Sequence, residues 1–288
     1  MRDQAESLRL RLLKMQGKKE AKVMAVVSGK GGVGKSNFSL NFAINLSKKG
    51  HSVLLFDMDI GMGNIDILLG HSSKVSFIDI FEPDMSFQDI IKSGPEGLSY
   101  ISGGTGLSNL FKLDRDKLDY LLNLLERLSL QYDYILFDMG AGITEDTLQF
   151  LLSVHEIFVI TTPEPTSMTD AYSMMKFICS KENNADFYLV VNRAQSTEDG
   201  VSTLKRLSQV MKQFLLKDIS LLGFLPDDRI VNKAVSRQIP FSIFEPKSKI
   251  SISLAELTDR YLNGLPNDLE KKKPASFITK LRTYFSER

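Results

Sequence analysis

The chain has 288 residues, of which 43% are apolar and 25% are charged, and its formal net charge at pH 7 is +1. This composition is typical of a globular protein and excludes a disordered, collagen-like or coiled-coil chain. No apolar run reaches the about 18 residues that a membrane span needs, and the basic start alternates leucine with arginine, unlike a signal peptide. A cytoplasmic protein is therefore expected. Its one cysteine, Cys179, cannot form an internal disulfide, and alone it cannot hold an iron–sulfur cluster.

Charge is distributed unevenly along the chain. Residues 1–22 carry a net +4 and residues 271–288 a net +5, which leaves −8 for the residues between them. An acidic body argues against a general nucleic-acid binder, so no nucleic-acid partner is expected. The basic ends indicate contacts with an anionic partner or membrane, and hence a protein that is cytoplasmic and peripheral on the cell membrane.

The first predicted element is a short amphipathic helix near the N-terminus. Ala5, Leu8, Leu12 and Met15 fall on one side of such a helix. At about a dozen residues the helix is marginal alone, so it is expected to need a surface to dock on. A polar stretch follows, and we set residues 1–21 apart as a leader.

From Val23 on, short apolar runs alternate with amphipathic stretches, which is the pattern of a parallel sheet with helices on both faces. We predict one domain over residues 22–266, with a three-layer, doubly wound, mostly parallel α/β fold. Helices are expected between most strands, for example over residues 37–50 and 114–130. The predicted strands cover residues 22–28, 52–58, 98–102, 133–139, 155–161, 186–192 and 220–225.

The last predicted element is a C-terminal helix in the segment 267–288, after a polar linker that ends in three lysines. A basic amphipathic helix suits an anionic membrane surface, which makes residues 274–288 a candidate membrane-targeting segment. The alternative is a helix that packs back on the domain. The side chains that share an arc of about 120° are Phe277, Ile278, Leu281, Tyr284 and Phe285.

A phosphate-binding loop follows the first predicted strand, where the run GKGGVGKS matches the full loop pattern. An apolar strand enters the loop and a helix leaves it, so the loop amides can surround a triphosphate at a helix N-terminus. Lys35 is expected to meet the β- and γ-phosphates of ATP and Ser36 to bind Mg²⁺. A glycine-rich turn without a ligand is the alternative. The residues expected to hold the nucleotide here are Gly29, Lys30, Gly31, Gly32, Val33, Gly34, Lys35, Ser36 and Asn37.

Three aspartates follow predicted strands, at the edge where such sheets bind ligands. Asp57 and Asp59 end the second strand, and Asp138 ends an apolar run that begins at Tyr134. Asp138 fits the carboxylate that holds Mg²⁺ through water, and the stretch 140–142 after it fits a flexible switch. An aspartate at a strand end is also a common cap residue, but three of them in this order after one phosphate loop favour a site.

Lys30 is not part of the general loop pattern. A second lysine at the head of Gly-Lys-Gly-Gly is the deviant signature of the MinD/ParA ATPases, and the chain resembles that family over about residues 22–265. The resemblance implies Mg-ATP hydrolysis by a homodimer that closes face to face over two ATP molecules, with Lys30 reaching into the partner's site. It also implies that Asp59 orients or activates the attacking water. The candidate catalytic residues are thus Lys30, Lys35 and Asp59, and the candidate metal ligands are Ser36, Asp57 and Asp138.

Three further segments resemble parts of the same family's site. In the segment 161–166 the resemblance implies that Glu164 touches the partner's nucleotide ribose. The segments around Asn192 and Pro226 resemble those that frame the adenine. For the proline-containing segments the alternative is a simple turn. The residues implied to contact the base are Asn192, Leu225, Pro226 and Asp227.

The two ends of the chain separate members of the family. The run Asp-Gln-Ala-x-x-Leu-Arg at residues 3–9 resembles the leader of the branch that controls flagellar number and placement, in which this segment stimulates the GTPase FlhF. That likeness implies an FlhF-type partner for residues 1–22 and further partners among the flagellar switch-complex proteins, with residues 167–180 as a candidate docking surface. It also implies a membrane-targeting helix of the MinD type at residues 274–288. The alternatives are a division-site MinD, a ParA-type DNA partition ATPase and a nucleotide-held scaffold that hardly hydrolyses ATP.

Overall fold

The computed structural model describes most of the chain. The described residues are 19–59, 64–71, 75–82, 85–103, 115–140, 145–181, 185–264 and 276–286. The predicted leader helix and the polar linker before the C-terminal helix lie outside these residues.

The core of the fold is one eight-stranded sheet with the order β3-β4-β2-β5-β1-β6-β7-β8. All neighbours are parallel except β3 and β4, which are antiparallel. Every predicted strand is confirmed, whereas β3 was not predicted because two residues carry no periodic pattern. The strands are β1 (Lys22–Val27), β2 (Val53–Met58), β3 (Lys92–Ser93), β4 (Ser99–Ile101), β5 (Tyr134–Met139), β6 (Glu156–Thr161), β7 (Asp186–Ala194) and β8 (Ser220–Pro226).

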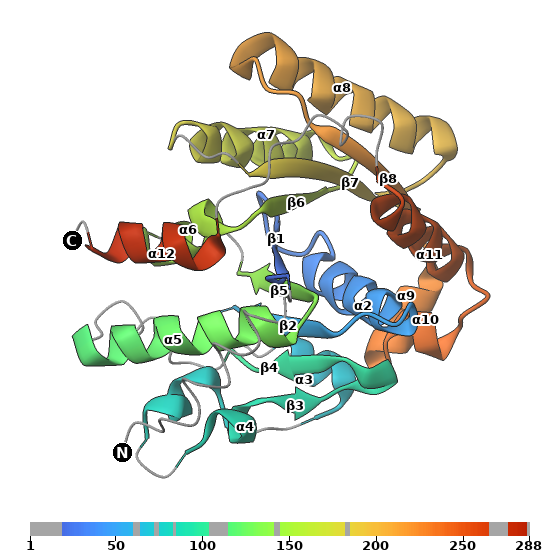
Figure 1. Cartoon of the computed structure of the whole chain (residues 1–288). Helices are drawn as coiled ribbons and strands as arrows, with labels where there is room; N and C mark the ends of the chain where they lie inside the picture. The colour runs from blue at the N-terminus through green and yellow to red at the C-terminus, as the bar shows by residue number, and fades with distance from the viewer. Residues whose placement is uncertain are drawn as a thin grey trace.

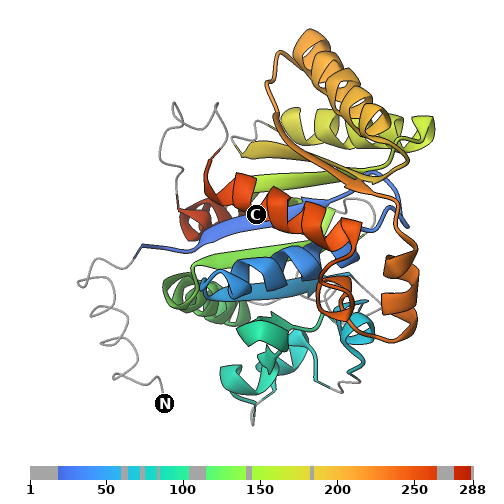
Figure 2. The same ribbon diagram turned by 90° about the vertical axis from the view of Figure 1, so that its right-hand side faces the viewer.

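Helices cover both faces of the sheet, as the sequence pattern predicts (Figure 1). One face carries α5, α6, α7 and α12, and the other carries α2, α9, α10 and α11; Figure 2 views the face with α2 and α11. The helices are α2 (Lys35–Lys48), α3 (Asn64–Leu69), α4 (Phe87–Ile90), α5 (Arg115–Gln131), α6 (Glu145–Ser153), α7 (Pro165–Cys179), α8 (Thr197–Leu215), α9 (Arg229–Ser236), α10 (Phe241–Phe244), α11 (Lys249–Leu262) and α12 (Phe277–Ser286), with the short 3-10 turns η1 (Phe77–Phe81) and η2 (Pro95–Gly97).

The strands feed two separate apolar cores, because successive side chains of a strand point to opposite faces. On β1, Val23 and Ala25 join the core beneath α5, α7 and α8, while Met24 and Val26 join the core beneath α2 and α11. The predicted leucine stripe of α5 supplies the first core. This burial on both faces explains why the strands read as continuous apolar runs.

The order of the strands places a ligand crevice beside β1. From β1 the chain moves outward to β2 on one side, and from β5 it crosses over β1 to β6 on the other. In open parallel sheets, ligands bind at the carboxyl ends of the strands where the order reverses in this way. The loop after β1 and the aspartates of β2 and β5 meet at this point.

The C-terminal helix α12 packs on the domain, which is the alternative that the sequence left open. Phe277 and Leu281 are buried in the core beside α5 and α6, and the rings of Phe277 and Phe137 lie 5.7 Å apart. On the outer side, the Arg282 guanidinium donates to the Asn123 side chain at 3.0 Å. The apolar face of α12 is thus covered in this structure. Membrane targeting stays a prediction, and it requires that α12 detach from α5 and α6. Among the described helices, none has both the length and the apolar character that a bilayer span requires.

Candidate nucleotide-binding and active site

The phosphate loop joins β1 to α2 through two left-handed glycines. Gly32 and Gly34 have φ angles of 79° and 91°, values that side chains with a Cβ rarely adopt. Gly34 directly precedes the first residue of α2, so the loop amides and the helix N-terminus face the same space. This arrangement favours the binding of an anion such as a nucleotide phosphate.

The first glycine of the loop has a different task, which is close packing. A Cβ on Gly29 would collide with the backbone carbonyl of Asp170 in α7. The loop backbone therefore lies directly against α7. Because the loop and the helix are closely packed, a movement of the loop on nucleotide binding would displace this helix.

An ion pair links the loop to β5. The Lys35 ammonium donates to one carboxylate oxygen of Asp138 at 2.9 Å, and both side chains are buried. The Ser39 hydroxyl donates to the same oxygen at 2.8 Å. The second oxygen of Asp138 has no hydrogen-bond partner among the described residues. Ser39, which the sequence analysis missed, lies one helical turn after Lys35 and so shares its face.

The neighbouring aspartates of β2 form a second acidic group. Burial, and after it the carboxylate of Asp138, raises the pKa of Asp57 to about 7. Asp57 accepts backbone N–H bonds from Asp59 and from Ile65 at 3.0 and 3.1 Å. The Asn64 amide donates to the Asp59 carboxylate at 2.7 Å. Asn64 was not predicted, although its place at the start of a helix five residues after Asp59 is a signal that could have indicated it.

These side chains fit the Mg²⁺ ion that accompanies ATP in this class of site. Ser36 starts α2 next to Lys35, and Asp57 and Asp138 pair in register on adjacent strands. Mg²⁺ prefers oxygen ligands and is held by one or two carboxylates together with phosphates. The second oxygen of Asp138 is buried without a hydrogen-bond partner among the described residues, and burial disfavours the charged form of Asp57. A nearby magnesium ion would favour the ionised form of both carboxyl groups, so these residues fit the ion.

Lys30 lies apart from this group, at the rim. Its ammonium donates to the Glu164 carboxylate at 2.6 Å and to the Thr166 hydroxyl at 3.2 Å. The hydrogen bond from Lys30 and its charge lower the pKa of Glu164. Within one chain, the two residues predicted to act across a dimer interface thus bind each other.

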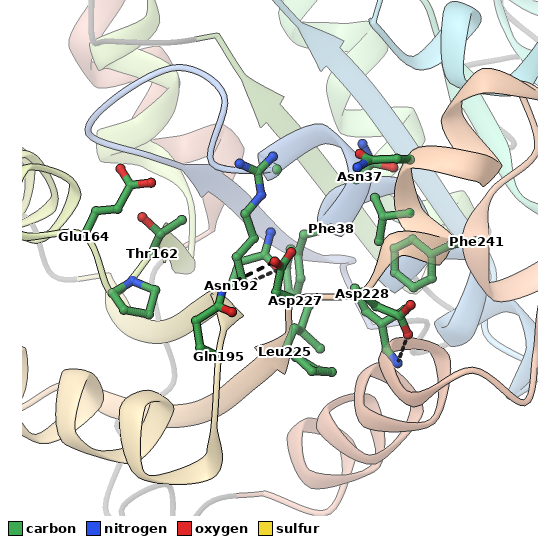
Figure 3. Close-up of a pocket in the computed structure, with 17 residues that line it drawn as sticks. Asn37, Phe38, Thr162, Glu164, Asn192, Gln195, Leu225, Asp227, Asp228 and Phe241 are labelled. Carbon is green, nitrogen blue, oxygen red and sulfur yellow. Dashed lines mark hydrogen bonds between the residues drawn. The ribbon is translucent and has the colours of Figure 1, made fainter.

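A cavity of about 460 Å³ opens beside the phosphate loop (Figure 3). Glu164 and Thr162 lie on one side of it, and Asn37 and Phe241 on the other. The predicted adenine-contacting residues all line this cavity, namely Asn192, Leu225, Pro226 and Asp227. Gly34, Arg193, Gln195 and Asp228 line it as well.

Asn192 braces the phosphate loop. Its amide nitrogen donates to the Val33 carbonyl at 2.8 Å, and its amide oxygen accepts from the Arg193 backbone at 3.0 Å. Arg193 has a left-handed φ of 57°, a conformation that costs a non-glycine residue about 1 to 2 kcal/mol. Strain of this kind concentrates at binding sites. Arg193 near the end of β7 and Gln195 just after it were not among the predicted contact residues, because an exposed position at the end of a strand carries no periodic signal.

The structure brings the predicted site residues together in two groups. The loop residues Gly29–Ser36, with the three aspartates, form the phosphate and metal end, and the cavity forms the base end. The switch expected at residues 140–142 is described only at Gly140, where a Cβ would lie 3.3 Å from the Asp59 carboxylate. Taken together, loop, lysine and carboxylates define the site of a P-loop nucleotide hydrolase.

Comparisons with known proteins agree with this site. The family profile described as "ParA: NUBPL iron-transfer P-loop NTPase" matches residues 19–261. The antiactivator FleN of Pseudomonas aeruginosa is 31% identical over 83% of this chain and 85% of its own length. The flagellum site-determining protein YlxH of Helicobacter pylori is 30% identical over 93% of this chain and 92% of its own.

Solved structures show the same fold. The cell division ATPase MinD of Pyrococcus furiosus superposes with a TM-score of 0.69 at 25% identity, over 84% of this chain and 99% of that one. MinD of Pyrococcus horikoshii in complex with Mg-ADP gives 0.68 at 24% identity, over 88% and 100%. The chain therefore belongs to the MinD/ParA family of P-loop ATPases, as a member of its FlhG (FleN, YlxH) type. It binds ATP with Mg²⁺ and hydrolyses it.

The raised pKa of Asp57 predicts a release of protons when Mg²⁺ and nucleotide bind. At pH 6.5 a carboxyl with a pKa of about 7 is mostly protonated, and an adjacent cation favours its ionised form. Binding of Mg-ADP at this pH should then release about 0.7 proton per chain, which calorimetry in two buffers of different ionisation enthalpy measures.

Two controls belong to this experiment. ADP in the presence of a chelator should release fewer protons, because no cation is then placed beside Asp57. Asp57→Asn cannot titrate, so it should remove the release. An equal release from Asp57→Asn and from the unaltered chain would contradict the assignment of the proton to this group.

Proposed function

We propose that this ATPase is a switch that dimerises with ATP, associates with the cell membrane in that state, and controls flagellar number and placement. The observation that supports ATP-dependent dimerisation is the Lys30–Glu164 ion pair at the rim of the nucleotide cavity. The flagellar role is supported by the relatives FleN and YlxH and by the leader run at residues 3–9.

The Lys30–Glu164 pair is the resting form of a dimer contact. The Lys30 and Glu164 side chains are 32% and 61% exposed, so water screens their attraction and the pair contributes little to stability. Its loss is therefore easily offset when a second subunit supplies new partners. On closure, Lys30 would turn to the partner's triphosphate, where a cation neutralises charge in the transition state of phosphoryl transfer. Glu164 would then face the partner's nucleotide ribose.

Within each subunit the chemistry would be divided among the residues of the site. The loop amides and Lys35 would hold the β- and γ-phosphates and neutralise the charge that grows on them. Asp59, held by Asn64, would orient the attacking water. Lys35 would exchange Asp138 for phosphate, which leaves both oxygens of Asp138 available to the hydrated metal ion.

Membrane association would depend on α12, because this helix is both basic and amphipathic. The seat of α12 on α5 and α6 hides its apolar side chains, so release would expose them to lipid. A single short helix binds a bilayer weakly, whereas two helices on one dimer gain effective concentration. Dimerisation by ATP would in this way set the time that the protein spends on the membrane.

Two other functions remain open to test. Division-site MinD proteins of Helicobacter pylori and Bacillus subtilis are 28% and 26% identical to this chain over 92% of it. A plasmid-partition function would require tight DNA binding, which the acidic body of the chain does not favour. The leader distinguishes the flagellar function, in which residues 1–22 would stimulate an FlhF-type GTPase and the body would bind flagellar switch-complex proteins.

Dimerisation is tested with variants that stop hydrolysis. Asp59→Ala should bind ATP and elute as a dimer in size-exclusion chromatography, because the variant cannot hydrolyse the ATP that holds the dimer closed. Adding Lys30→Ala should return it to a monomer that still binds nucleotide. Lys205→Ala, an exposed lysine on α8, is the matched control and should leave the dimer intact. A dimer that forms without Lys30 would refute the contact in trans.

Release of α12 is tested by locking the helix. In a Cys179→Ser background, Asn123→Cys and Arg282→Cys place one thiol on α5 and one on α12. A cleavable bismaleimide that joins the two thiols should hold α12 on α5. Flotation with anionic vesicles and ATP should then be lost, and it should return when the linker is cleaved. Each single-cysteine variant, treated alike, should float normally. If the locked chain floats as well as the cleaved one, α12 is not the membrane anchor.

The flagellar function is tested with the leader alone. A peptide of residues 1–22 should accelerate GTP hydrolysis by the FlhF protein of the same organism severalfold. The same peptide with Leu8→Ser and Leu12→Ser should be inactive, because its apolar side is interrupted. Equal rates with and without the first peptide would favour the division-site function.

A further inference from the structure

A second hollow of the surface, a groove of about 350 Å³, opens between α5 and the segment from η1 to α4 (Figure 1). Its apolar wall is made by Ile80, Phe81, Met85 and Tyr120. The Tyr120 side of this wall faces solvent, with 39% of the residue exposed, and the Tyr120 and Phe81 rings lie 6.3 Å apart. Among the described residues, none that lines this groove also lines the nucleotide cavity. We call it the α5 groove.

The rim of the α5 groove is acidic. Glu82 and Asp116 line it, and Asp119 is exposed one turn further along α5. Lys117 supplies one positive charge, and its ammonium lies 6.0 Å from the centre of the Phe81 ring. Three carboxylates thus surround one lysine. The charge of this surface complements a segment that is apolar on one side and basic on the other, and it opposes an anionic lipid surface.

The leader of the same chain has this chemistry. Residues 1–18 contain five Lys/Arg and two Asp/Glu, a net charge of +3. Ala5, Leu8, Leu12 and Met15 fall on one side of the helix that the sequence predicts. A helix of this length is marginal in water, so it needs a surface against which to pack.

The leader enters the described part of the chain within reach of the groove. The Ala21 backbone N–H donates to the Ser129 carbonyl near the end of α5 at 2.6 Å. Tyr120 lies nine residues earlier on α5, which is about 14 Å along the helix. The chain between Met15 and Ala21 spans at most about 20 Å when extended. The apolar side of the leader can therefore reach the groove without any change in the described domain.

We propose that the leader docks in the α5 groove of its own chain and is then withheld from its partner. Its leucines would cover the Phe81 and Tyr120 rings, in the manner of helix recognition by an apolar groove, and its arginines would face Glu82 and Asp116. Because the leader is tethered at Ala21, even a weak contact would be well populated. The withholding step rests on the proposed function, in which residues 1–22 stimulate a GTPase.

The α5 groove lies where the rest of the molecule can affect it. Phe77, the first residue of η1, packs its ring 4.7 Å from that of Phe56, the residue before Asp57 on β2. On α5, Asn123 accepts the hydrogen bond from Arg282 of α12 and lies one turn after Tyr120. A shift of the β2 end on metal binding, or the departure of α12, would therefore reach the two walls of the groove.

Docking is tested with a fluorescent reporter, because the chain has no tryptophan. Tyr120→Trp places one in the α5 groove of the full chain, and quenching by acrylamide is measured with ADP bound. Leu8→Ser with Leu12→Ser should raise the quenching constant at least twofold, because the leader no longer covers the ring. Glu82→Lys with Asp116→Lys should have the same effect. All four changes together should raise the constant no further, since both pairs abolish one contact.

Matched controls separate docking from other causes. Phe214→Trp, an exposed position on α8, should not respond to the leader changes. Glu245→Lys with Glu256→Lys reverses two exposed charges elsewhere and should leave the Tyr120→Trp reporter unaffected. All variants should bind ADP as the unaltered chain does. A reporter that ignores the leader changes would overturn the inference, and so would quenching that depends on protein concentration, which indicates a second copy.

A GTPase assay tests the withholding step. At equal concentration, the unaltered chain should stimulate the FlhF-type partner severalfold less than the peptide of residues 1–22 does. Glu82→Lys with Asp116→Lys should raise the stimulation by the full chain to that of the peptide. Equal stimulation by the peptide, the unaltered chain and this variant would refute the withholding and leave the proposed function intact. A reporter that responds while the peptide is inactive would uphold docking and refute the GTPase partner.

Discussion

The buried pair of Lys35 and Asp138 is the contact on which the site depends. It joins the phosphate loop to the central strands in a place where an unpaired charge would be costly, and removing one partner of such a pair commonly costs about 3 to 5 kcal/mol. A second carboxyl, Asp57, lies beside it with a raised pKa. The site thus brings two carboxyl groups together around one ammonium group. A nucleotide phosphate would give Lys35 another anion, and the two aspartates would then be available to a magnesium ion.

The same contact explains how a small ligand can influence distant surfaces. The loop that Lys35 ends lies against α7 through Gly29, and the aspartates that face it hold the start of α3 through Asn64 and Ile65. Asn192 ties the loop to β7, from which α8 follows. Nucleotide binding thus acts on a packed arrangement with little free volume, in which helices move as units.

The C-terminal helix is amphipathic, and the structure shows its apolar face packed on the domain. Its apolar face is satisfied by the core beside α5 and α6, and a lipid surface would satisfy it in the same way. If the proposed function holds, the free-energy difference between the packed and the membrane-bound helix would be smaller than the free energy of either burial alone. Dimerisation would then be able to shift the helix from one state to the other. A helix with only one possible binding surface would be either a permanent membrane anchor or a permanent part of the domain.

Seven of the strands, the phosphate loop and the aspartates could be predicted from the sequence, because apolar runs, glycines and strand-end carboxylates are local signals. The sequence also predicted the amphipathic face of α12, including Phe277 and Leu281. The packing of this face on the domain and the ion pair between Lys30 and Glu164 in the same chain could be seen only in the folded structure. The hydrogen bond from Asn64 to Asp59 likewise depends on the fold. Except for the bond from Asn64, these contacts join residues that are far apart in the sequence. Strand order and helix packing determine which of them meet, and a local sequence pattern does not reveal this.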